Sequence, residues 1–451
     1  MTKLQELRKR HHTFVYKKYS YSENNNDLEI TFSFFLHPDI YFSPKIVIKN
    51  AADKTQLIDK KILNNLIFHI GLMEIFSYWK STCAPEIKIA AGSLNSNQID
   101  WLINLLNQGM GEFFYQNKID FTIDNFVSIT SRGQVSTTPE LINVSDKKHL
   151  TLIGGGKDSI VSIEVLKKLE NHQLALVLNP SSATESIIKQ SGLTETIIVN
   201  REIDKKLLEL NKKGYLNGHT PFSAYLGFLS LLVASLFKCK NIVVSNERSS
   251  NEENAIYLNK KINHQYSKSF EFEKSFRNYT HQYISPSLNY FSLVRSLWEI
   301  QISKIFARYP QYFQYFKSCN QKQKQWCCQC PKCLSVFILL SPFLKQKTIS
   351  IFDKDLYEDL NFALILEKLT GLKQPKPFEC VGTKEEIIIG LYLSIKQYDN
   401  QLPKLLKFAK ENIIDKEKNL NQRAKSLLQS WGNDEFLSEL QIKTLKKLAY
   451  A

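Results

Sequence analysis

The residues best suited to bind an anion lie between positions 148 and 170. An apolar stretch, Leu150 to Ile153, precedes three glycines, and an amphipathic pattern follows them. The loop between them consists of Gly154, Gly155, Gly156, Lys157, Asp158 and Ser159. Glycines let backbone N–H groups approach a ligand, and a helix N-terminus favours negative charge. The spacing matches neither dinucleotide-binding nor Walker glycines, so we predict a phosphate cradle of another kind. The alternative is an ordinary glycine-rich turn of an α/β domain.

Two further polar segments are expected beside this loop, because ligands of open α/β sheets bind at the carboxyl ends of the strands. Residues 217–220 carry His219 ahead of a predicted helix, where a base or ribose could lie. Residues 245–250 carry Glu247 and Arg248 directly after a predicted strand. A carboxylate suits a metal ion, and the planar guanidinium suits a phosphate. The alternatives are a capping or core histidine and a surface ion pair.

Proton transfer is the chemistry predicted for residues 263–269, a polar stretch between two helical patterns. His264 titrates near neutral pH, and Lys268 does so where burial lowers its pKa. The alternative for this stretch is a solvated loop.

Four cysteines have the spacing of a zinc site, and they are Cys319, Cys327, Cys330 and Cys333. Three thiolates at i, i+3 and i+6 with one upstream can complete a tetrahedron around zinc. Cys328 is the surplus thiol and could exchange with Cys327. No signal peptide is visible at the N-terminus, so a reducing compartment is expected, where such crowding favours metal over disulfides. Free buried cysteines or a redox pair are the alternatives.

The elements that must position these residues follow from the hydrophobic pattern. Alternation within residues 13–50 predicts antiparallel strands, with a further strand near residues 86–91. Beyond residue 148 strands and helices alternate, which predicts a parallel sheet covered by helices. Its strands are predicted at residues 150–153, 174–178, 195–199 and 241–245. Helices are predicted at residues 61–80, 99–115, 157–170, 184–191 and 221–237, the last with Thr220 as its N-cap and Pro221 as its first residue.

Composition limits the partners. The net charge is +15, but the densest basic cluster, Arg8 to Arg10, is too short to predict a nucleic-acid site, so small anionic substrates are expected instead. The longest apolar run, Leu226 to Phe237, contains serines and is too short to span a bilayer. We therefore expect a soluble cytoplasmic protein with no membrane span and no nucleic-acid partner.

The glycine loop resembles the S-G-G-x-D-S pyrophosphate loop of the ATP pyrophosphatases, which split ATP into AMP and pyrophosphate. Gly154 stands where that pattern has its first serine. The cysteine spacing resembles the zinc site after the ATP domain of 7-cyano-7-deazaguanine synthase, another enzyme with this loop. The predicted fold class is therefore α/β, with a parallel-sheet core of the adenine nucleotide alpha hydrolase type.

Two or three domains are expected from a chain of 451 residues. We predict an N-terminal α+β domain over residues 1–146 and an ATP-binding catalytic domain with the cysteine cluster over residues 147–345. A lysine-rich helical region follows over residues 346–451, and the polar stretch 133–147 is predicted as a linker.

Several segments together resemble one family, from about residue 13 to residue 390. They are Asn64–Lys80, Gly111-Glu112-Phe113, the glycine loop, Asn217-Gly218-His219, SNERSS at 245–250, NHQYSKS at 263–269, Tyr290–Leu293, Trp326–Cys333 and Glu379-Cys380-Val381-Gly382. The chain is similar to the MurL-type UDP-N-acetylmuramoyl-L-alanyl-L-glutamate epimerases of bacterial cell-wall synthesis.

This resemblance implies an isomerase that depends on ATP and magnesium and converts the terminal L-glutamate of the UDP-muramoyl dipeptide to D-glutamate. It also implies a partner ligase that adds the L-glutamate. Adenylation of the carboxylate would make the Cα proton removable. Glu247 is our candidate magnesium ligand, and His264 and Lys268 are our candidate acid–base pair, with His219 in reserve.

Two other functions are compatible with the same motifs. One is a nucleobase- or tRNA-modifying ATP pyrophosphatase similar to 7-cyano-7-deazaguanine synthase. The other is a non-enzymatic ATP sensor whose zinc knuckle binds a partner. AMP formation that depends on the muramoyl dipeptide would separate the epimerase from both.

Overall fold

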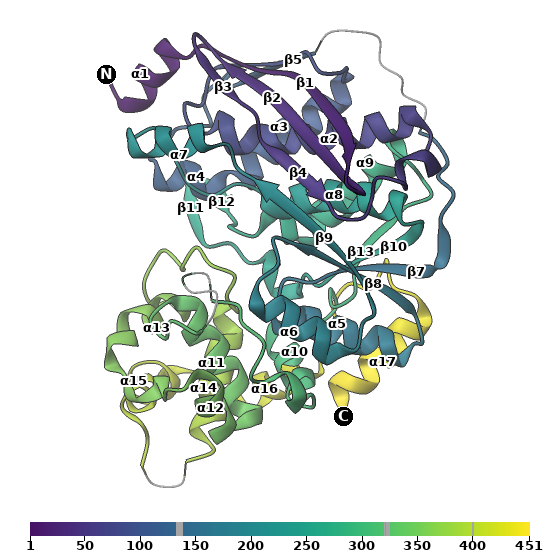
Figure 1. The fold of residues 1–451 in the computed structure, drawn as a ribbon. Helices are drawn as coiled ribbons and strands as arrows, with labels where there is room; N and C mark the ends of the chain where they lie inside the picture. Colours follow the sequence, from purple (N-terminus) through teal and green to yellow (C-terminus); the bar gives the residue numbers. More distant parts are fainter. Residues whose placement is uncertain (132–138, 320, 322–324, 399–400) are drawn as a thin grey trace.

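One mixed β-sheet runs through the larger part of the molecule (Figure 1). The computed structural model describes residues 1–131, 139–319, 321, 325–398 and 401–451. Residues 133–138 of the predicted linker lie outside the described residues, and residues 145–147 already belong to a strand.

The N-terminal half of the sheet is mainly antiparallel, as the alternation in residues 13–50 predicts. Its strands are β1 (Thr13–Asn24), β2 (Asp27–Leu36), β3 (Ile40–Phe42), β4 (Lys45–Ile48), β5 (Glu86–Ile89) and β6 (Ser128–Ser131). Alternate residues of β2 are buried, since only one face of this half packs against the core. β5 and β6 extend it in parallel with β1.

The second half is a five-stranded parallel arrangement. Its strands are β7 (Ser145–Leu152), β8 (His172–Leu178), β9 (Glu195–Glu202), β10 (Cys239–Val244) and β13 (Asn289–Ser292). They lie in the order β13-β10-β7-β8-β9. From β7 the chain first adds β8 and β9 on one side, and then adds β10 and β13 on the other side of β7. The reversal between β7 and β10 is a topological switch point, where the loops after both strands open a crevice for a ligand.

The two halves join through β4 and β9, which pair antiparallel. Arg201 on β9 strengthens this junction by donating to both carboxylate oxygens of Glu74 at 2.6 and 2.7 Å. Both side chains are largely buried, so each charge needs the other to offset the free-energy cost of its burial.

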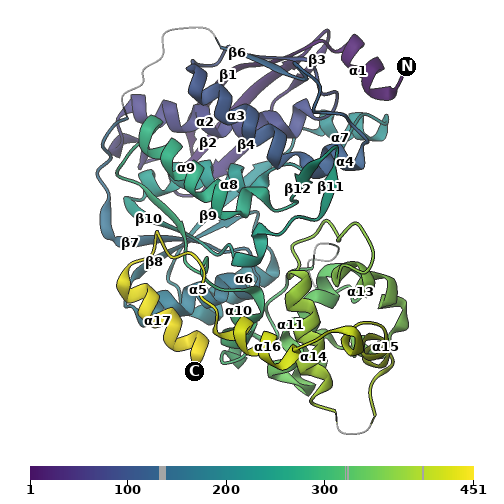
Figure 2. The same ribbon diagram turned by 180° about the vertical axis from the view of Figure 1, so that it is seen from behind.

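Helices cover both faces of the parallel strands (Figures 1 and 2). One face carries α8 (Phe222–Leu236) and α9 (Phe270–Tyr283), with α2 (Lys60–Trp79) beside α8 over β1 and β2. The other face carries α5 (Lys157–Lys168), α6 (Ser182–Ser191) and α10 (Glu299–Phe306). α8 is apolar on nearly every side because it packs against β10 and β7 of the sheet and against α2 beside it. Among the described helices, none combines the length and apolar character needed to cross a bilayer.

The predicted start of α8 is wrong by one residue. Thr220 was expected as the N-cap, but the helix begins at Phe222. Pro221 has φ −71° and ψ 67°, and the Phe222 N–H donates to the Thr220 carbonyl at 2.7 Å. These values describe an inverse γ-turn, so Pro221 ends the preceding loop instead of opening the helix.

The smaller elements complete the first 330 residues. They are α1 (Lys3–Arg10), α3 (Ser96–Gly109), α4 (Gly111–Gln116), α7 (Lys205–Lys212), the hairpin β11 (Ala255–Tyr257) and β12 (Lys260–Ile262), and the short 3-10 helices η1 (Thr55–Leu57), η2 (Arg248–Asn251), η3 (Tyr266–Lys268) and η4 (Pro310–Tyr312).

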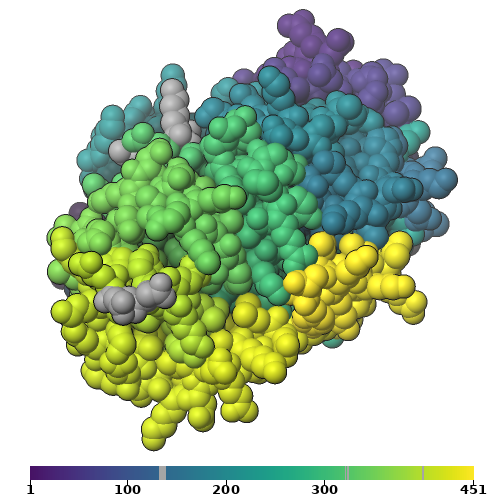
Figure 3. All heavy atoms as spheres, turned by 90° about the horizontal axis from the view of Figure 1, so that it is seen from below, coloured from purple at the N-terminus to yellow at the C-terminus, as the bar shows by residue number. Residues whose placement is uncertain are grey.

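The C-terminal region is helical, as predicted, and its described residues add no strand. α11 (Pro331–Leu344) precedes it, inside the predicted catalytic domain. The elements of the region itself are α12 (Gln346–Phe352), η5 (Leu356–Glu358), η6 (Leu360–Phe362), α13 (Ala363–Leu369), α14 (Lys384–Ile395), α15 (Lys404–Asn412), η7 (Ile414–Lys416), α16 (Leu420–Gln429) and α17 (Glu439–Tyr450). Figure 3 shows the yellow C-terminal residues lying against blue-teal residues from much earlier in the chain. There α17 contacts α5 and α10, and Lys304 donates to the Ala449 carbonyl at 3.0 Å.

Candidate active site

A cavity of about 440 Å³ opens at the switch point. The segments after β7 and β10 line it, and Lys332 and Cys380 line it from later in the chain. The polar residues that line it are Asp158, Ser159, Ser181, Ser223, Ser245, Asn246, Glu247, Lys268, Tyr290, Lys317, Ser318, Cys319, Lys332 and Cys380, together with Gly154 and Gly156.

The glycine loop has the backbone of an anion cradle. Gly155 has φ +87°, a conformation that residues with a Cβ rarely adopt, and its carbonyl accepts from Lys317 N–H at 3.0 Å. A Cβ on Gly154 would meet nothing within 4 Å, so this position faces open space at the cavity. Gly156 is the N-cap of α5 and has no capping side chain, which leaves the first N–H groups of the helix to a ligand.

Lys157 and Ser159 make hydrogen bonds that stabilise the glycine loop. Lys157 is buried, does not line the cavity, and donates to Asp158 at 2.7 Å and to Glu299 at 2.8 Å. Burial disfavours its charge, but the two carboxylates raise its pKa. The Ser159 hydroxyl donates to the Gly156 carbonyl at 2.9 Å and lines the cavity.

Glu247 and Arg248 are separated by the structure. Glu247 is buried at the cavity, where desolvation and the nearby Asp158 raise its pKa although Lys268 opposes the shift. Two carboxylates in one desolvated site repel each other, so a cation between them would be stabilised. Arg248 instead lies over the ring of Trp298, 4.2 Å from its centre, and does not line the cavity.

A thiol with two basic neighbours, Cys380, also lines the cavity. Lys268 Nζ donates to Cys380 Sγ at 3.2 Å, and His264 also hydrogen-bonds to Cys380. His264 Nδ1 lies 2.5 Å from Glu112 Oε2, so this carboxylate orients the imidazole. The cluster therefore joins α4, the segment before η3, η3 itself and the segment before α14.

The charges of this cluster favour a thiolate. Burial would raise the pKa of Cys380, but Lys268 and His264 outweigh it and lower the pKa to about 6. Burial disfavours the imidazolium of His264, yet its hydrogen bonds to Cys380 and Glu112 raise its pKa to about 9. The negative charge on Cys380 likewise raises the pKa of Lys268. At neutral pH both are cations, the form in which each member of the predicted acid–base pair can donate a proton.

His219 lies beside this cluster but does not line the cavity. Its ring centre is 4.5 Å from that of His264, and its Nδ1 is 3.5 Å from Glu112 Oε2. Burial, His264, Lys80 and Lys268 lower its pKa to about 3, so it remains neutral.

Arg295 binds the backbone of the two segments that carry Glu247 and Lys268. It is buried, pairs with Glu273 Oε2 at 2.8 Å, and donates to the carbonyls of Glu247 at 2.9 Å and Lys268 at 2.7 Å. One guanidinium thus fixes the loop after β10 relative to η3.

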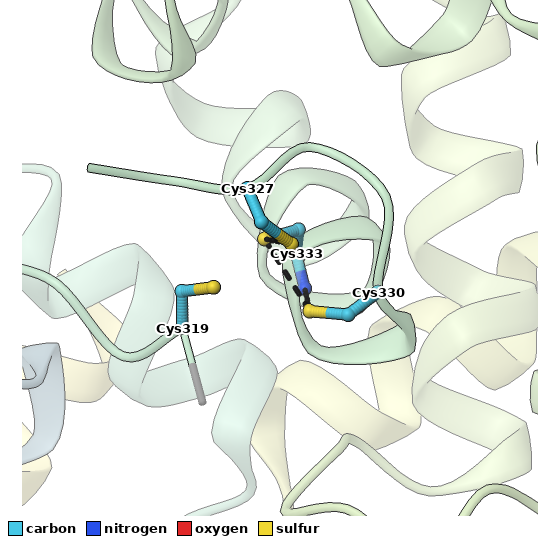
Figure 4. Close-up of side chains that lie close together, drawn as sticks. All are labelled: Cys319, Cys327, Cys330 and Cys333. Atoms are coloured by element: carbon cyan, nitrogen blue, oxygen red, sulfur yellow. Dashed lines mark hydrogen bonds between the residues drawn. The ribbon is translucent and has the colours of Figure 1, made fainter. Parts of the chain in front are cut away.

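The four predicted zinc ligands converge (Figure 4). Their sulfur atoms all lie within 4.8 Å of one another, with Cys327–Cys333 at 3.6 Å and Cys330–Cys333 at 3.5 Å. Zinc–sulfur bonds of about 2.3 Å give sulfur separations of roughly 3.8 Å in a tetrahedron, so these thiols could hold the ion. Cys328 points elsewhere and donates to the Phe352 carbonyl at 3.4 Å.

Comparison with known proteins matches the MurL N-terminal domain to residues 5–293 and the MurL C-terminal domain to residues 314–424. The chain belongs to the MurL family of epimerases. Three relatives carry the name UDP-N-acetyl-alpha-D-muramoyl-L-alanyl-L-glutamate epimerase. The Micromonospora sp. protein is 33% identical over 71% of this chain and 72% of its own length. The Salinispora tropica protein is 34% identical over 70% of each chain, and the Xanthomonas oryzae pv. oryzae protein is 32% identical over 69% of this chain and 70% of its own.

Membership of the MurL family confirms the expected enzyme class, an isomerase. Both matched domains contribute to the cavity, since Lys268 lies in the first and Cys380 in the second.

The sequence did not single out Glu112, Glu299, Lys332 or Cys380 as site residues of this MurL-family epimerase. Glu112 and Cys380 lie in segments that carry the family resemblance, and that was the available signal. Their roles depend on contacts across 152 and 112 residues, which local spacing does not reveal.

Arg295→Lys should reduce epimerase kcat/KM by about 10²-fold, because one ammonium cannot hold Glu273 and both loop carbonyls, and small displacements at a site are costly. Steady-state kinetics and urea unfolding are the measurements, with a stability loss of about 1–3 kcal/mol expected. Arg277→Lys is the matched control. Arg277 binds Asn289 and the carbonyl of Tyr290 but holds neither the Glu247 segment nor the Lys268 segment, so its kcat/KM should fall far less than that of Arg295→Lys. Equal activity of both variants would contradict the role of Arg295.

Proposed function

We propose that this protein epimerises the terminal L-glutamate of UDP-N-acetylmuramoyl-L-alanyl-L-glutamate to D-glutamate, for peptidoglycan synthesis, by adenylating the carboxylate with ATP. The family of the chain supports the substrate. One structural observation carries the mechanism: the glycine cradle and the Cys380–Lys268 pair line the same cavity.

Adenylation solves the chemical problem of the reaction. A free carboxylate resists loss of the adjacent Cα proton, because the carbanion would add a second negative charge beside the first. Attack of the carboxylate oxygen on the α-phosphorus of ATP releases pyrophosphate and gives a neutral acyl group. The carbonyl of this acyl-adenylate can then accept the electron pair when the Cα proton leaves. Proton return on the other face and hydrolysis release AMP and the D-epimer.

The glycine loop is the proposed site of the β- and γ-phosphates. Open space at Gly154, the positive φ of Gly155 and the uncapped start of α5 allow backbone N–H groups to surround an anion. Lys317 and Lys332 line the same cavity and add positive charge.

Glu247 and Asp158 are the residues proposed to hold magnesium. Their mutual repulsion, which contributes to the raised pKa of Glu247, fits a site for a divalent cation. When bound, this ion would neutralise charge on the phosphates.

Zinc is the ion proposed for Cys319, Cys327, Cys330 and Cys333, in a structural role. The hydrogen bond with Cys333 and burial raise the pKa of Cys330, so a cation would be needed to hold this group of thiols as thiolates. Cys319 also lines the cavity, so the metal would stabilise part of its wall.

A ligase that attaches L-glutamate to UDP-N-acetylmuramoyl-L-alanine must act before this enzyme if the proposal is right. The substrate and ATP are both polyanions, which fits the net charge of +15.

Incubation with ATP, magnesium and the muramoyl dipeptide in deuterated water tests the proposed function. We expect AMP, pyrophosphate, and a D-glutamyl product that carries deuterium at Cα. Nucleotide chromatography, chiral analysis after hydrolysis and mass spectrometry are the measurements. Formation of ADP in place of AMP, or epimerisation without ATP, would contradict the adenylation mechanism.

Gly154→Ala and Gly155→Ala form a matched pair that tests the cradle. Gly154→Ala should leave stability unchanged but raise the KM for ATP, because its methyl enters open space where the phosphates are proposed to bind. Gly155→Ala should also lower the free energy of unfolding, by about 1–2 kcal/mol, because of its positive φ. ATP titration of initial rates and urea unfolding measure these effects. An unchanged KM for ATP in Gly154→Ala would show that the phosphates of ATP do not bind at this position.

Cys330→Ser should lose bound zinc and lower the melting temperature, because metal binding energy contributes to folding. Cys328→Ser should keep its zinc, since Cys328 faces the Phe352 carbonyl. Elemental analysis of protein prepared with reductant and without chelator gives the metal content. A parent protein free of zinc under these conditions would refute the metal assignment.

A further inference from the structure

We propose that Cys380 is a catalytic residue, the base that removes the Cα proton of the substrate glutamate on one face. This inference rests on the proposed epimerisation through an acyl-adenylate, and it assigns one of the two proton transfers that such a reaction requires.

Position is the first argument. Cys380 is partly exposed, lines the cavity that also contains the glycine loop, and therefore can reach a bound substrate. Its sulfur is fixed by the Lys268 ammonium at 3.2 Å and by the hydrogen bond with His264. A carbonyl activated at the cradle would present its Cα to this same cavity.

The charged groups around Cys380 favour the reactive form. Lys268 from η3, His264 from the preceding segment and Lys332 from α11 lower its pKa, against burial and against Glu379, its neighbour in the chain. Glu247 also interacts electrostatically with Lys268 and therefore shares that cation with the thiolate. The cations prevail, with a thiol pKa of about 6, and a thiolate is the form that acts as a base.

Two other cysteines outside the zinc cluster, Cys83 and Cys239, lack this environment. Cys83 is buried, and desolvation raises its pKa despite Arg8. Cys239 is buried in β10, and desolvation raises its pKa to about 12. Neither lines the cavity.

The proton transfer balances without any additional reagent. The Cα–H bond breaks as the S–H bond of Cys380 forms, and the electron pair moves through Cα–C onto the acyl oxygen. The thiolate becomes a thiol, and the adenylate becomes an enolate. A proton delivered to the other face of Cα restores the carbonyl with inverted configuration. In the reverse direction the Cys380 thiol returns its proton.

Lys268 and His264 are positioning residues in this scheme. Both are cations at neutral pH, and both contact the sulfur. Because Lys268 hydrogen-bonds to Cys380, this scheme places it on the same face of Cα as the thiolate and assigns the proton transfer on the other face to another group. Glu112 in turn holds the His264 ring.

Cys380→Ser replaces the thiolate with a hydroxyl that does not ionise near neutral pH. We expect substrate-dependent pyrophosphate release of the same order as in the parent, while epimer formation falls by about 10²–10⁴-fold in both directions. In deuterated water, Cα exchange should persist for one epimer alone, because the base on the other face remains. Cys239→Ser is the matched thiol-to-hydroxyl control; its sulfur contacts the Phe237 carbonyl at 3.7 Å, and it should epimerise normally.

Three results would overturn the assignment. If Cys380→Ser exchanges the Cα hydrogen of both epimers at the parent rate, Cys380 is not one of the two bases. A folded variant that no longer releases pyrophosphate would place Cys380 in the ATP step. Loss of exchange from both epimers with adenylation intact would make it a substrate-positioning residue. Failure of the proposed function itself looks different, since then the parent protein would form no AMP or no D-epimer.

Alkylation of the parent protein tests the same residue without a substitution. The rate of Cys380 modification by iodoacetamide, followed by peptide mass spectrometry, should rise with a midpoint near pH 6, and the midpoint should move upward in Lys268→Met. Loss of epimerisation should parallel modification of Cys380. Full activity after complete modification of Cys380 would overturn the proposal.

Discussion

The geometry of the site depends on one buried guanidinium. Arg295 donates to the carbonyls of Glu247 and Lys268 while Glu273 neutralises its charge. These carbonyls belong to two loops that approach the cavity from different parts of the chain. Because a buried carbonyl without a donor is costly, the loops have little freedom to separate. The carboxylate of Glu247 and the ammonium of Lys268 are therefore held on the two sides of a common cavity.

A second buried charge connects this site to the C-terminal region. Glu299 accepts from Lys157, at the glycine loop, at 2.8 Å and from Lys332, in α11, at 3.3 Å. Burial would raise the pKa of Glu299, but these two cations keep it low. The Lys332 N–H also donates to Glu379 at 2.9 Å, and Glu379 precedes Cys380. A continuous set of polar contacts thus connects the thiol to the cradle, although the two lie more than two hundred residues apart.

Local sequence predicted those parts of the molecule that local physics determines. The alternation after residue 148 gave the parallel strands and their helices, and three glycines before an amphipathic pattern placed the loop at a helix start. The order of the strands, and hence the switch point, came only from the structure. Thr220 failed as a cap because Pro221 forms a γ-turn, a choice that propensity does not reveal. The partners of His264, which are Glu112 and Cys380, were unpredictable because their contacts join segments more than a hundred residues apart in the sequence.

The cavity separates two electrostatic environments that the proposed reaction needs together. Near the glycine loop, Asp158 and Glu247 give a negative site whose repulsion a cation relieves. Around Cys380, Lys268 and His264 stabilise the anion of its sulfur. Direct contact of the carboxylates with the thiolate would raise its pKa and weaken its ionisation. Lys268 lies between the two environments and interacts with both, so its single positive charge allows an acid-rich metal site and a thiolate base to share one cavity.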